Sequence, residues 1–150
     1  MNKHDQRRDS ASPRARNDAI HLFVYGTLKR GEPNFERYVP DALTIEEAEI
    51  PGRLYHLPAG YPGLLLGGDE MAHGEAMTFV DLPAKLRAVD PLETCDPARP
   101  ETSLYQRDVY TIYLKPARRP VPAWVYVYAQ PLPAGARLVP GGNWRSDREG

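Results

Sequence analysis

A single glutamate, Glu93, lies where a carboxyl group could perform acid–base chemistry. It follows the end of a predicted helix, in the run Asp90-Pro91-Leu92-Glu93-Thr94-Cys95. If its side chain points inward, burial disfavours the carboxylate and raises its pKa, and the carbonyls at the helix end act in the same direction. Such a glutamate is suited to general acid–base catalysis near neutral pH. The alternative is a solvated loop glutamate. Asp90 is the weaker candidate and is interpreted as a helix-end residue that bonds nearby backbone.

A second candidate is the stretch Tyr25-Gly26-Thr27-Leu28, where an apolar run ends. Gly26 can take backbone angles that other residues resist, and it lets a ligand approach the main chain closely. If the N–H groups from Gly26 to Leu28 are released from the sheet, they can bind a carboxylate or a polarised carbonyl oxygen. The alternative is an ordinary exit from strand to turn, which so short a motif does not exclude.

Cys95 is the only cysteine, so a disulfide within the chain is excluded and a reducing cytosol is the expected compartment. A catalytic cysteine would need a histidine beside it, supplied by His21, His56 or His73, and a structural thiol is the preferred interpretation. The histidines lack metal-ligand spacing and no second cysteine is present, so no metal site is predicted.

Nucleotide-binding motifs are absent from the sequence, which has neither G-x-x-x-x-G-K-[ST] nor G-x-G-x-x-G, and no cofactor is predicted. Trp124, Tyr126 and Tyr128 alternate along one predicted strand and could stack on bases. The net charge of −1 gives no broad basic surface, so a core or pocket lining is preferred, and neither nucleic acid nor a membrane is a predicted partner. No apolar run is long enough to span a bilayer, and no signal peptide opens the chain.

These residues must be positioned by a chain that is rich in short strands. Strands are predicted at residues 20–25, 52–57, 64–66, 73–80, 105–114 and 121–129. A helix is predicted up to about Asp90, with Asp81 as its N-cap and Pro91 as its limit, and residues 33–39 are expected to form a short helix or turn. About six strands and one clear helix indicate a small α+β protein with a closed or nearly closed sheet.

The length of 150 residues suits one domain, and 26% charged with 41% hydrophobic residues is typical of a globular protein. Residues 1–18 have almost no large apolar side chains and are predicted to be a disordered tail. The folded domain is predicted at residues 19–145, and residues 146–150 are expected to be frayed.

Six motifs in order resemble those of the gamma-glutamylcyclotransferase-like family, in its AIG2-like and gamma-glutamylamine cyclotransferase branch. They are Y-G-T-L-K-R-G-E-P-N, G-R-L-Y-H-L-P-A-G-Y-P-G-L, H-G-E-A, D-P-L-E, Y-Q-R and A-W-V-Y-V-Y. The resemblance covers roughly residues 20–145. It implies a small mixed β-barrel with flanking helices and a pocket at one end.

The resemblance also implies a reaction, in which the α-amine of a γ-glutamyl unit attacks its own side-chain carbonyl, forms 5-oxoproline and expels an amine. By position it makes Glu93 the catalytic residue and Tyr25, Gly26, Thr27 and Leu28 the substrate-binding loop, with Tyr128 closing the pocket. Departures from the family pattern are Pro91-Leu92 and Thr94-Cys95 around the glutamate. The alternatives are a non-catalytic module that binds a small metabolite or peptide in the same pocket, and a cysteine hydrolase that uses Cys95.

Overall fold

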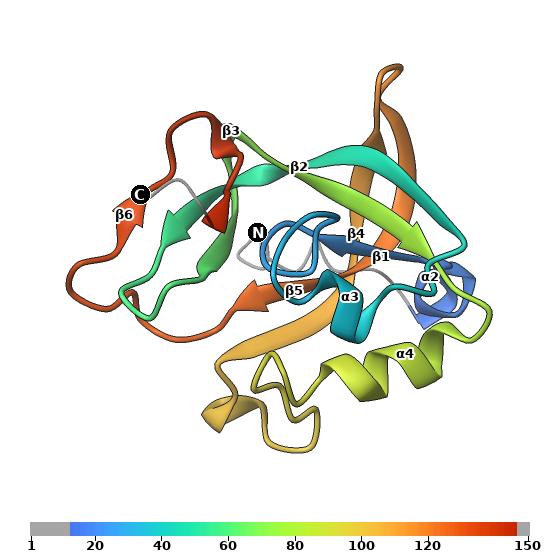
Figure 1. The fold of residues 1–150 in the computed structure, drawn as a ribbon, viewed down its shortest axis with the longest axis horizontal. Coiled ribbons are helices and arrows are strands. Elements are labelled where there is room, and N and C mark those ends of the chain that lie inside the picture. The colour runs from blue at the N-terminus through green and yellow to red at the C-terminus, as the bar shows by residue number, and fades with distance from the viewer. Residues whose placement is uncertain (1–12, 147–150) are drawn as a thin grey trace, which may run out of the picture.

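The structure is a computed structural model, and it describes residues 13–146. Six strands, three helices and two 3-10 turns follow one another along these residues (Figure 1). In chain order they are α2 (Pro13–Asp18), β1 (His21–Val24), α3 (Phe35–Tyr38), β2 (Thr44–His56), β3 (Pro62–Thr78), α4 (Leu82–Val89), η1 (Pro100–Thr102), β4 (Tyr105–Leu114), β5 (Arg119–Tyr128), β6 (Arg137–Leu138) and η2 (Pro140–Gly142). No helix within residues 13–146 is long and apolar enough to cross a membrane.

All six strands belong to one mixed sheet. Their order is β3-β1-β5-β4-β2-β6, and β3 also pairs with β2, so the pairings return to their starting strand. The β1–β5 pair is parallel, whereas the other pairs are antiparallel. Strands β2 and β4 share only two register pairs, so the sheet forms a ring of pairings rather than a regular barrel. The predicted α+β class with a mixed sheet and flanking helices is confirmed.

Strand β1 runs through the middle of the molecule, and all four of its residues are buried. Successive side chains of a strand point to opposite faces, and here each face has its own apolar cluster. Leu22 and Val24 pack in the cluster that α4 covers, together with Leu86, whereas Phe23 packs in the second cluster with Trp144. Because both faces of β1 are packed, the loop that follows it starts from a fixed base.

Helix α4 confirms the predicted N-cap and end. The Asp81 side chain accepts a hydrogen bond from the backbone N–H of Ala84 at 3.0 Å, which satisfies one of the free donors of the first turn. The helix buries Leu82, Leu86 and Val89 beneath the sheet (Figure 1). Pro91 ends it, so the chain turns directly towards the candidate glutamate.

Two differences from the sequence predictions concern the edges of elements. Strand β2 begins at Thr44, well before the predicted residue 52, because residues 44–51 pair with β3, and Glu49 in this acidic stretch is buried against the guanidinium of Arg118. Strand β3 is also continuous from Pro62, so the predicted runs at 64–66 and 73–80 belong to one strand.

Of the predicted tail, residues 1–12 lie outside the described residues, and Pro13–Asp18 differ from the expectation because they form helix α2. The guanidinium of Arg16 pairs with both carboxylate oxygens of Asp108 on β4, at 2.7 and 2.9 Å. This partner is distant in sequence, and it holds the helix against the sheet. At the other end, the N–H of Ser146 donates to Glu32 at 3.2 Å, and residues 147–150 lie outside the described residues. The domain limits of 19–145 stay a prediction.

Candidate active site

A cavity of about 240 Å³ opens where β1 ends. It is bounded by the loop after β1, the turn after α4, the start of β3 and the facing ends of β4 and β5. Its lining residues are Phe23, Val24, Tyr25, Gly26, Thr27, Leu28, Asn34, Tyr61, Pro62, Leu92, Glu93, Thr94, Leu104, Tyr105 and Tyr126. The cavity therefore contains both candidate motifs, which are far apart in the sequence.

The Tyr25–Leu28 loop presents its main chain to the cavity. The carbonyl of Gly26 accepts from the N–H of Lys29 at 3.1 Å, and the carbonyl of Thr27 accepts from the N–H of Asn34 at 2.9 Å. Within the described part of the chain, the N–H groups of Gly26, Thr27 and Leu28 donate to no residue. The loop thus has its carbonyls bonded internally and its donors available, an arrangement that can bind a developing negative charge.

Glycine at position 26 is required by a close approach. A Cβ atom there would lie 2.6 and 2.9 Å from two ring carbons of Pro62, at the start of β3. Because these distances are far shorter than carbon–carbon contact, any larger residue would push the loop away from β3. The asparagine side chain of Asn34 adds a second support, since its Nδ2 donates to Oγ1 of Thr27 at 2.9 Å.

Glu93 lies on the opposite wall, in a tight turn beyond α4. Its backbone N–H bonds the carbonyls of Val89 and Asp90 at 3.2 and 3.1 Å, and Thr94 adopts a left-handed φ of 49° directly after it. The side chain is half-buried and lines the cavity. Among residues 13–146 no hydrogen bond or ion pair engages its carboxyl group.

Burial raises the pKa of Glu93 from 4.5 to about 7, and the negative charge of Asp90 adds to the rise. The carboxyl therefore exchanges its proton close to neutral pH, as a general acid–base catalyst must. The sequence-based expectation of an inward-facing glutamate with a raised pKa agrees with this geometry.

Tyrosine side chains line the cavity together with Glu93. Tyr25 donates to the carbonyl of Tyr126 at 2.5 Å, and Tyr105 donates to the carbonyl of Pro62 at 2.5 Å. Burial, together with the nearby Glu93 charge, raises the pKa of both phenols far above the ordinary value. These hydroxyls stay protonated and neutral, so they leave Glu93 as the titrating group of the cavity near neutral pH.

Tyr128 differs from its predicted place. It is buried behind Tyr105, with ring centroids 5.4 Å apart in an edge-on contact, and it is not a lining residue. Tyr126, two positions earlier on the same face of β5, lines the cavity instead. In the register of β4 against β5, Tyr105 lies opposite Tyr128 and Arg107 lies opposite Tyr126, whose hydroxyl reaches Asp90 at the end of α4. The sequence indicated the face but not which of the two tyrosines reaches the cavity.

Sequence reasoning also missed Asn34 and Tyr105 as lining residues. Asn34 and Tyr105 were within quoted motifs, so a signal existed. Tyr61, which also lies within a quoted motif, and Leu104 line the cavity too, and they come from loops that the sequence alone does not orient.

Cys95 lies outside this cavity. It is buried, and burial raises the pKa of its thiol, which is the opposite of the change that activates a nucleophile. Two of the histidines that could have paired with Cys95 bind other residues. His56 accepts a hydrogen bond from the indole N–H of Trp144 at 2.9 Å, and His73 contacts Lys115 at 2.7 Å. The geometry does not favour a cysteine hydrolase.

The comparison with protein families is decisive for identity. The family described as "Gamma-glutamyl cyclotransferase, AIG2-like" matches residues 22–146, which is most of the chain. The chain belongs to this family. The resemblance inferred from six motifs is thereby confirmed, and both walls of the cavity lie within the matched residues.

Individual relatives agree with this family assignment. A curated γ-L-glutamyl-butirosin B γ-glutamyl cyclotransferase of Niallia circulans is 38% identical over 73 residues, a match that covers 49% of this chain and 45% of that relative. The match thus spans less than half the length of the relative.

Solved structures show the same fold. An AIG2-like protein of Mus musculus aligns with a TM-score of 0.61 and 26% identity, over 85% of this chain and 89% of that one. An uncharacterized protein of Pyrococcus horikoshii aligns with a TM-score of 0.61 and 18% identity, over 87% and 94% of the two chains. At this lower identity the second similarity concerns the fold alone.

Proposed function

We propose that this protein is a γ-glutamyl cyclotransferase, which converts a γ-glutamyl amide into 5-oxoproline and a free amine. One observation carries the proposal: a carboxyl group with a pKa of about 7, on Glu93, shares a cavity with the unbonded N–H groups of Gly26 to Leu28. Acid–base chemistry and oxyanion stabilisation are the two requirements of an intramolecular aminolysis. Family membership supports the same reaction.

In the proposed reaction, the cavity holds the γ-glutamyl unit in a folded conformation, so that its α-amine reaches its own γ-carbonyl carbon. Glu93 accepts the proton that the attacking nitrogen loses as the new C–N bond forms. The negative charge that develops on the carbonyl oxygen is stabilised by the N–H groups of the Gly26–Leu28 loop. The bond to the leaving nitrogen then breaks, and Glu93 returns the proton to that nitrogen. The products are 5-oxoproline and a neutral amine.

The leaving group is proposed to be an amine without a carboxylate near the reacting nitrogen. Glu93 is the one charged side chain among the residues that line the cavity in residues 13–146, and no lysine, arginine or histidine lines it. Because the main-chain donors of Gly26 to Leu28 serve the developing oxyanion, a carboxylate beside the leaving nitrogen would meet no cation among the lining residues.

A substrate panel tests the reaction and the leaving group together. The protein is incubated with γ-glutamyl-butylamide, γ-glutamyl-lysine isopeptide, γ-glutamyl-alanine and glutathione, and release of 5-oxoproline is followed by chromatography. We expect turnover of the first two and little of the last two. Preference for γ-glutamyl-alanine or glutathione would contradict the proposed leaving group. Ligand binding without product from any substrate would instead favour the non-catalytic module.

The role of Glu93 is tested by Glu93→Gln, which keeps the shape of the side chain and removes its proton chemistry. We expect turnover to fall by roughly 10²-fold or more. The matched control is Glu101→Gln, an exposed glutamate on η1 that does not line the cavity, which should leave turnover unchanged. Wild-type turnover in Glu93→Gln would remove this residue from the mechanism.

The pH dependence of turnover follows from the same group. Because the base must be ionised to accept a proton, kcat should rise with pH up to about 7 and then level, with an acid limb set by the pKa of Glu93. We also propose a reducing, cytosolic location, since the one cysteine forms no disulfide within the chain.

A further inference from the structure

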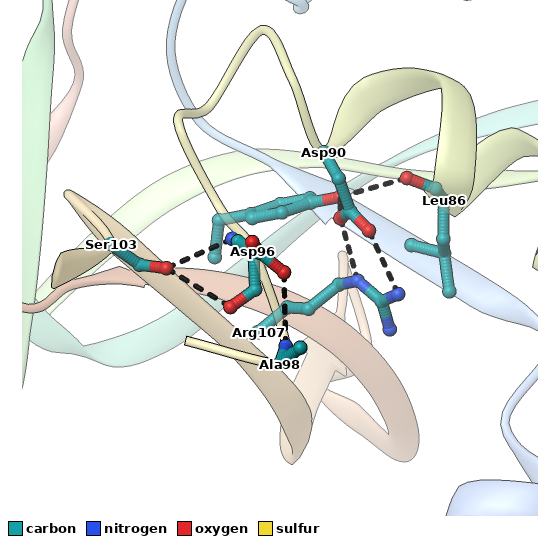
Figure 2. Close-up of polar contacts among 7 residues, drawn as sticks. Leu86, Asp90, Asp96, Ala98, Ser103 and Arg107 are labelled. Carbon is teal, nitrogen blue, oxygen red and sulfur yellow. Dashed lines mark hydrogen bonds and ion pairs between the residues drawn. The ribbon is translucent and has the colours of Figure 1, made fainter. Parts of the chain in front are cut away.

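Asp90 forms hydrogen bonds through both its side chain and its main chain. Its carbonyl oxygen accepts from the N–H groups of Glu93 and Cys95, at 3.1 and 2.9 Å. These two bonds define the turn that carries Glu93. Asp90 is not a lining residue of the cavity, and its side chain points towards Arg107 on β4 (Figure 2).

Three hydrogen bonds fix this side chain. The guanidinium of Arg107 donates to both carboxylate oxygens, from Nε at 2.7 Å and from Nη2 at 2.9 Å (Figure 2). The hydroxyl of Tyr126 donates to Oδ1 at 2.6 Å. Arg107 and Tyr126 are direct cross-strand partners on β4 and β5, so they approach Asp90 side by side. A bidentate guanidinium and a phenol thus hold one carboxylate in a single orientation.

The partners of Asp90 are themselves held in place. The guanidinium of Arg107 lies 5.1 Å from the ring centroid of Trp124, a favourable contact of a cation with an aromatic face. The side chains of Asp90 and Arg107 are only 11% and 16% exposed. Breaking so buried a pair leaves an uncompensated charge, so the pair resists rearrangement.

Tyr126 connects this cluster to the other wall of the cavity. Its hydroxyl bonds Asp90, whereas its backbone carbonyl accepts the hydrogen bond from Tyr25, the first residue of the loop with free N–H groups. The turn with Glu93 and the loop with the donors are therefore joined through one residue of β5. Apart from Tyr126, the residues of the two walls come from segments that are distant in the sequence.

We propose that Asp90, Arg107 and Tyr126 are positioning residues that hold the Glu93 carboxyl at a fixed place relative to the Tyr25–Leu28 loop. None of the three is assigned a proton-transfer step. Their function is geometric: a reacting group that is misplaced by about 1 Å can lose roughly 10²-fold in rate. The inference rests on the proposed function for its effect on turnover, and it also makes structural predictions that do not need turnover.

The cluster also sets the charge around Glu93. The titratable groups that influence or adjoin it are Asp90 from the end of α4, Tyr25 from the loop, Tyr105 and Tyr126 from the sheet, and Cys95 from its own turn. Of these, Asp90 is the one that raises the pKa of Glu93 after burial itself. Removing its charge, with Arg107 retained, lowers the pKa of Glu93. A merely structural residue would not change that pKa.

Three variants test the inference. Asp90→Asn keeps the shape and one acceptor oxygen but removes the charge, and Tyr126→Phe removes a single hydroxyl, so it decides the test if Asp90→Asn does not fold. The control is Asp108→Asn on β4, the strand of Arg107, which breaks a bidentate but more exposed pair with Arg16 of α2, away from the cavity.

Two measurements are made on each variant. Hydrogen exchange of the Glu93 and Cys95 amides is followed by NMR, and kcat and KM are measured across pH. For Asp90→Asn we expect hydrogen exchange of the two amides to speed up about tenfold. We expect kcat to fall about tenfold or more while KM stays within about threefold of wild type. The acid limb of the kcat profile should move to lower pH. For Tyr126→Phe we expect a loss of roughly two- to tenfold in kcat. Asp108→Asn should match wild type in both measurements.

The results separate two kinds of failure. If the wild-type chain converts no substrate, the proposed function fails, and amide exchange together with an NMR titration of the Glu93 carboxyl still decides the inference. If Asp90→Asn and Tyr126→Phe exchange these two amides no faster than Asp108→Asn, the positioning role is overturned. Unchanged kcat and an unmoved acid limb in an active enzyme would overturn it as well.

Discussion

The Glu93 carboxyl should reduce the stability of the folded protein at neutral and alkaline pH, so Glu93→Gln is expected to stabilise the protein while it lowers turnover by roughly 10²-fold or more. Burial, together with Asp90, raises the pKa of this group from 4.5 to about 7. The folded state thus binds the proton more tightly than the unfolded state. Glutamine resembles the protonated, neutral form at every pH and does not carry the cost of a buried charge.

The sign and size of the effect follow from linkage between protonation and folding. Below pH 4.5 both states are protonated, and the group costs nothing. Between pH 4.5 and about 7 the folded state must release a proton that it holds more tightly, so the cost grows. Above pH 7 the full cost is present. Since one pKa unit corresponds to about 1.4 kcal/mol, the full cost is at most about 3 kcal/mol.

Urea unfolding of wild type, Glu93→Gln and Glu101→Gln at several pH values measures this cost. The stability advantage of Glu93→Gln over wild type should grow by roughly 2 to 3 kcal/mol between pH 5 and pH 9. Glu101→Gln, at an exposed position, should show no such growth. A difference between Glu93→Gln and wild type that is constant with pH would refute the reasoning, because it would show that burial does not perturb the carboxyl.

Other parts of the fold give shorter predictions. Gly26→Ala places a Cβ against Pro62, so it should lower kcat/KM about tenfold or more and cost about 1 to 3 kcal/mol in urea unfolding. Asp81→Ala removes the bond to the Ala84 N–H and should cost about 1 kcal/mol in urea unfolding, with turnover unchanged. Trp144→Ala empties a fully buried site and should cost about 3 to 5 kcal/mol, which calorimetry would register as a lower Tm.

The parts of the site that were predictable from the sequence have local causes. Pro91 ends α4 whatever the helix packs against, so the sequence alone places Glu93 just after a helix end. The close approach of the loop to Pro62 requires glycine at position 26. This glycine, at the end of an apolar strand, was visible in the sequence. These signals lie within a few residues of the groups they describe, and the alternation of β5 similarly indicated an aromatic face.

The parts that were missed depend on distant partners. Asp90 was interpreted as a helix-end residue that bonds backbone, and its side chain instead binds Arg107 and Tyr126, which are 17 and 36 positions away. Whether Tyr126 or Tyr128 reaches the cavity depends on the register of β4 against β5. The helix of Pro13–Asp18 forms an ion pair with Asp108, a residue 92 positions from Arg16, and no local pattern predicts such a partner.

The hydrogen bond from Tyr25 to the carbonyl of Tyr126 joins residues that are 101 positions apart. During synthesis, the Tyr25–Leu28 loop is therefore made long before β5, the strand that anchors it. Until β5 is made, the cavity lacks the residues that β5 contributes. Strand β1 also pairs in parallel with β5, so the long chain segment between the two strands must be closed into a loop. This closure costs chain entropy before the contacts between the strands can form. We expect binding competence to arrive late in folding, on the millisecond-to-second timescale of proteins dominated by non-local strand pairing.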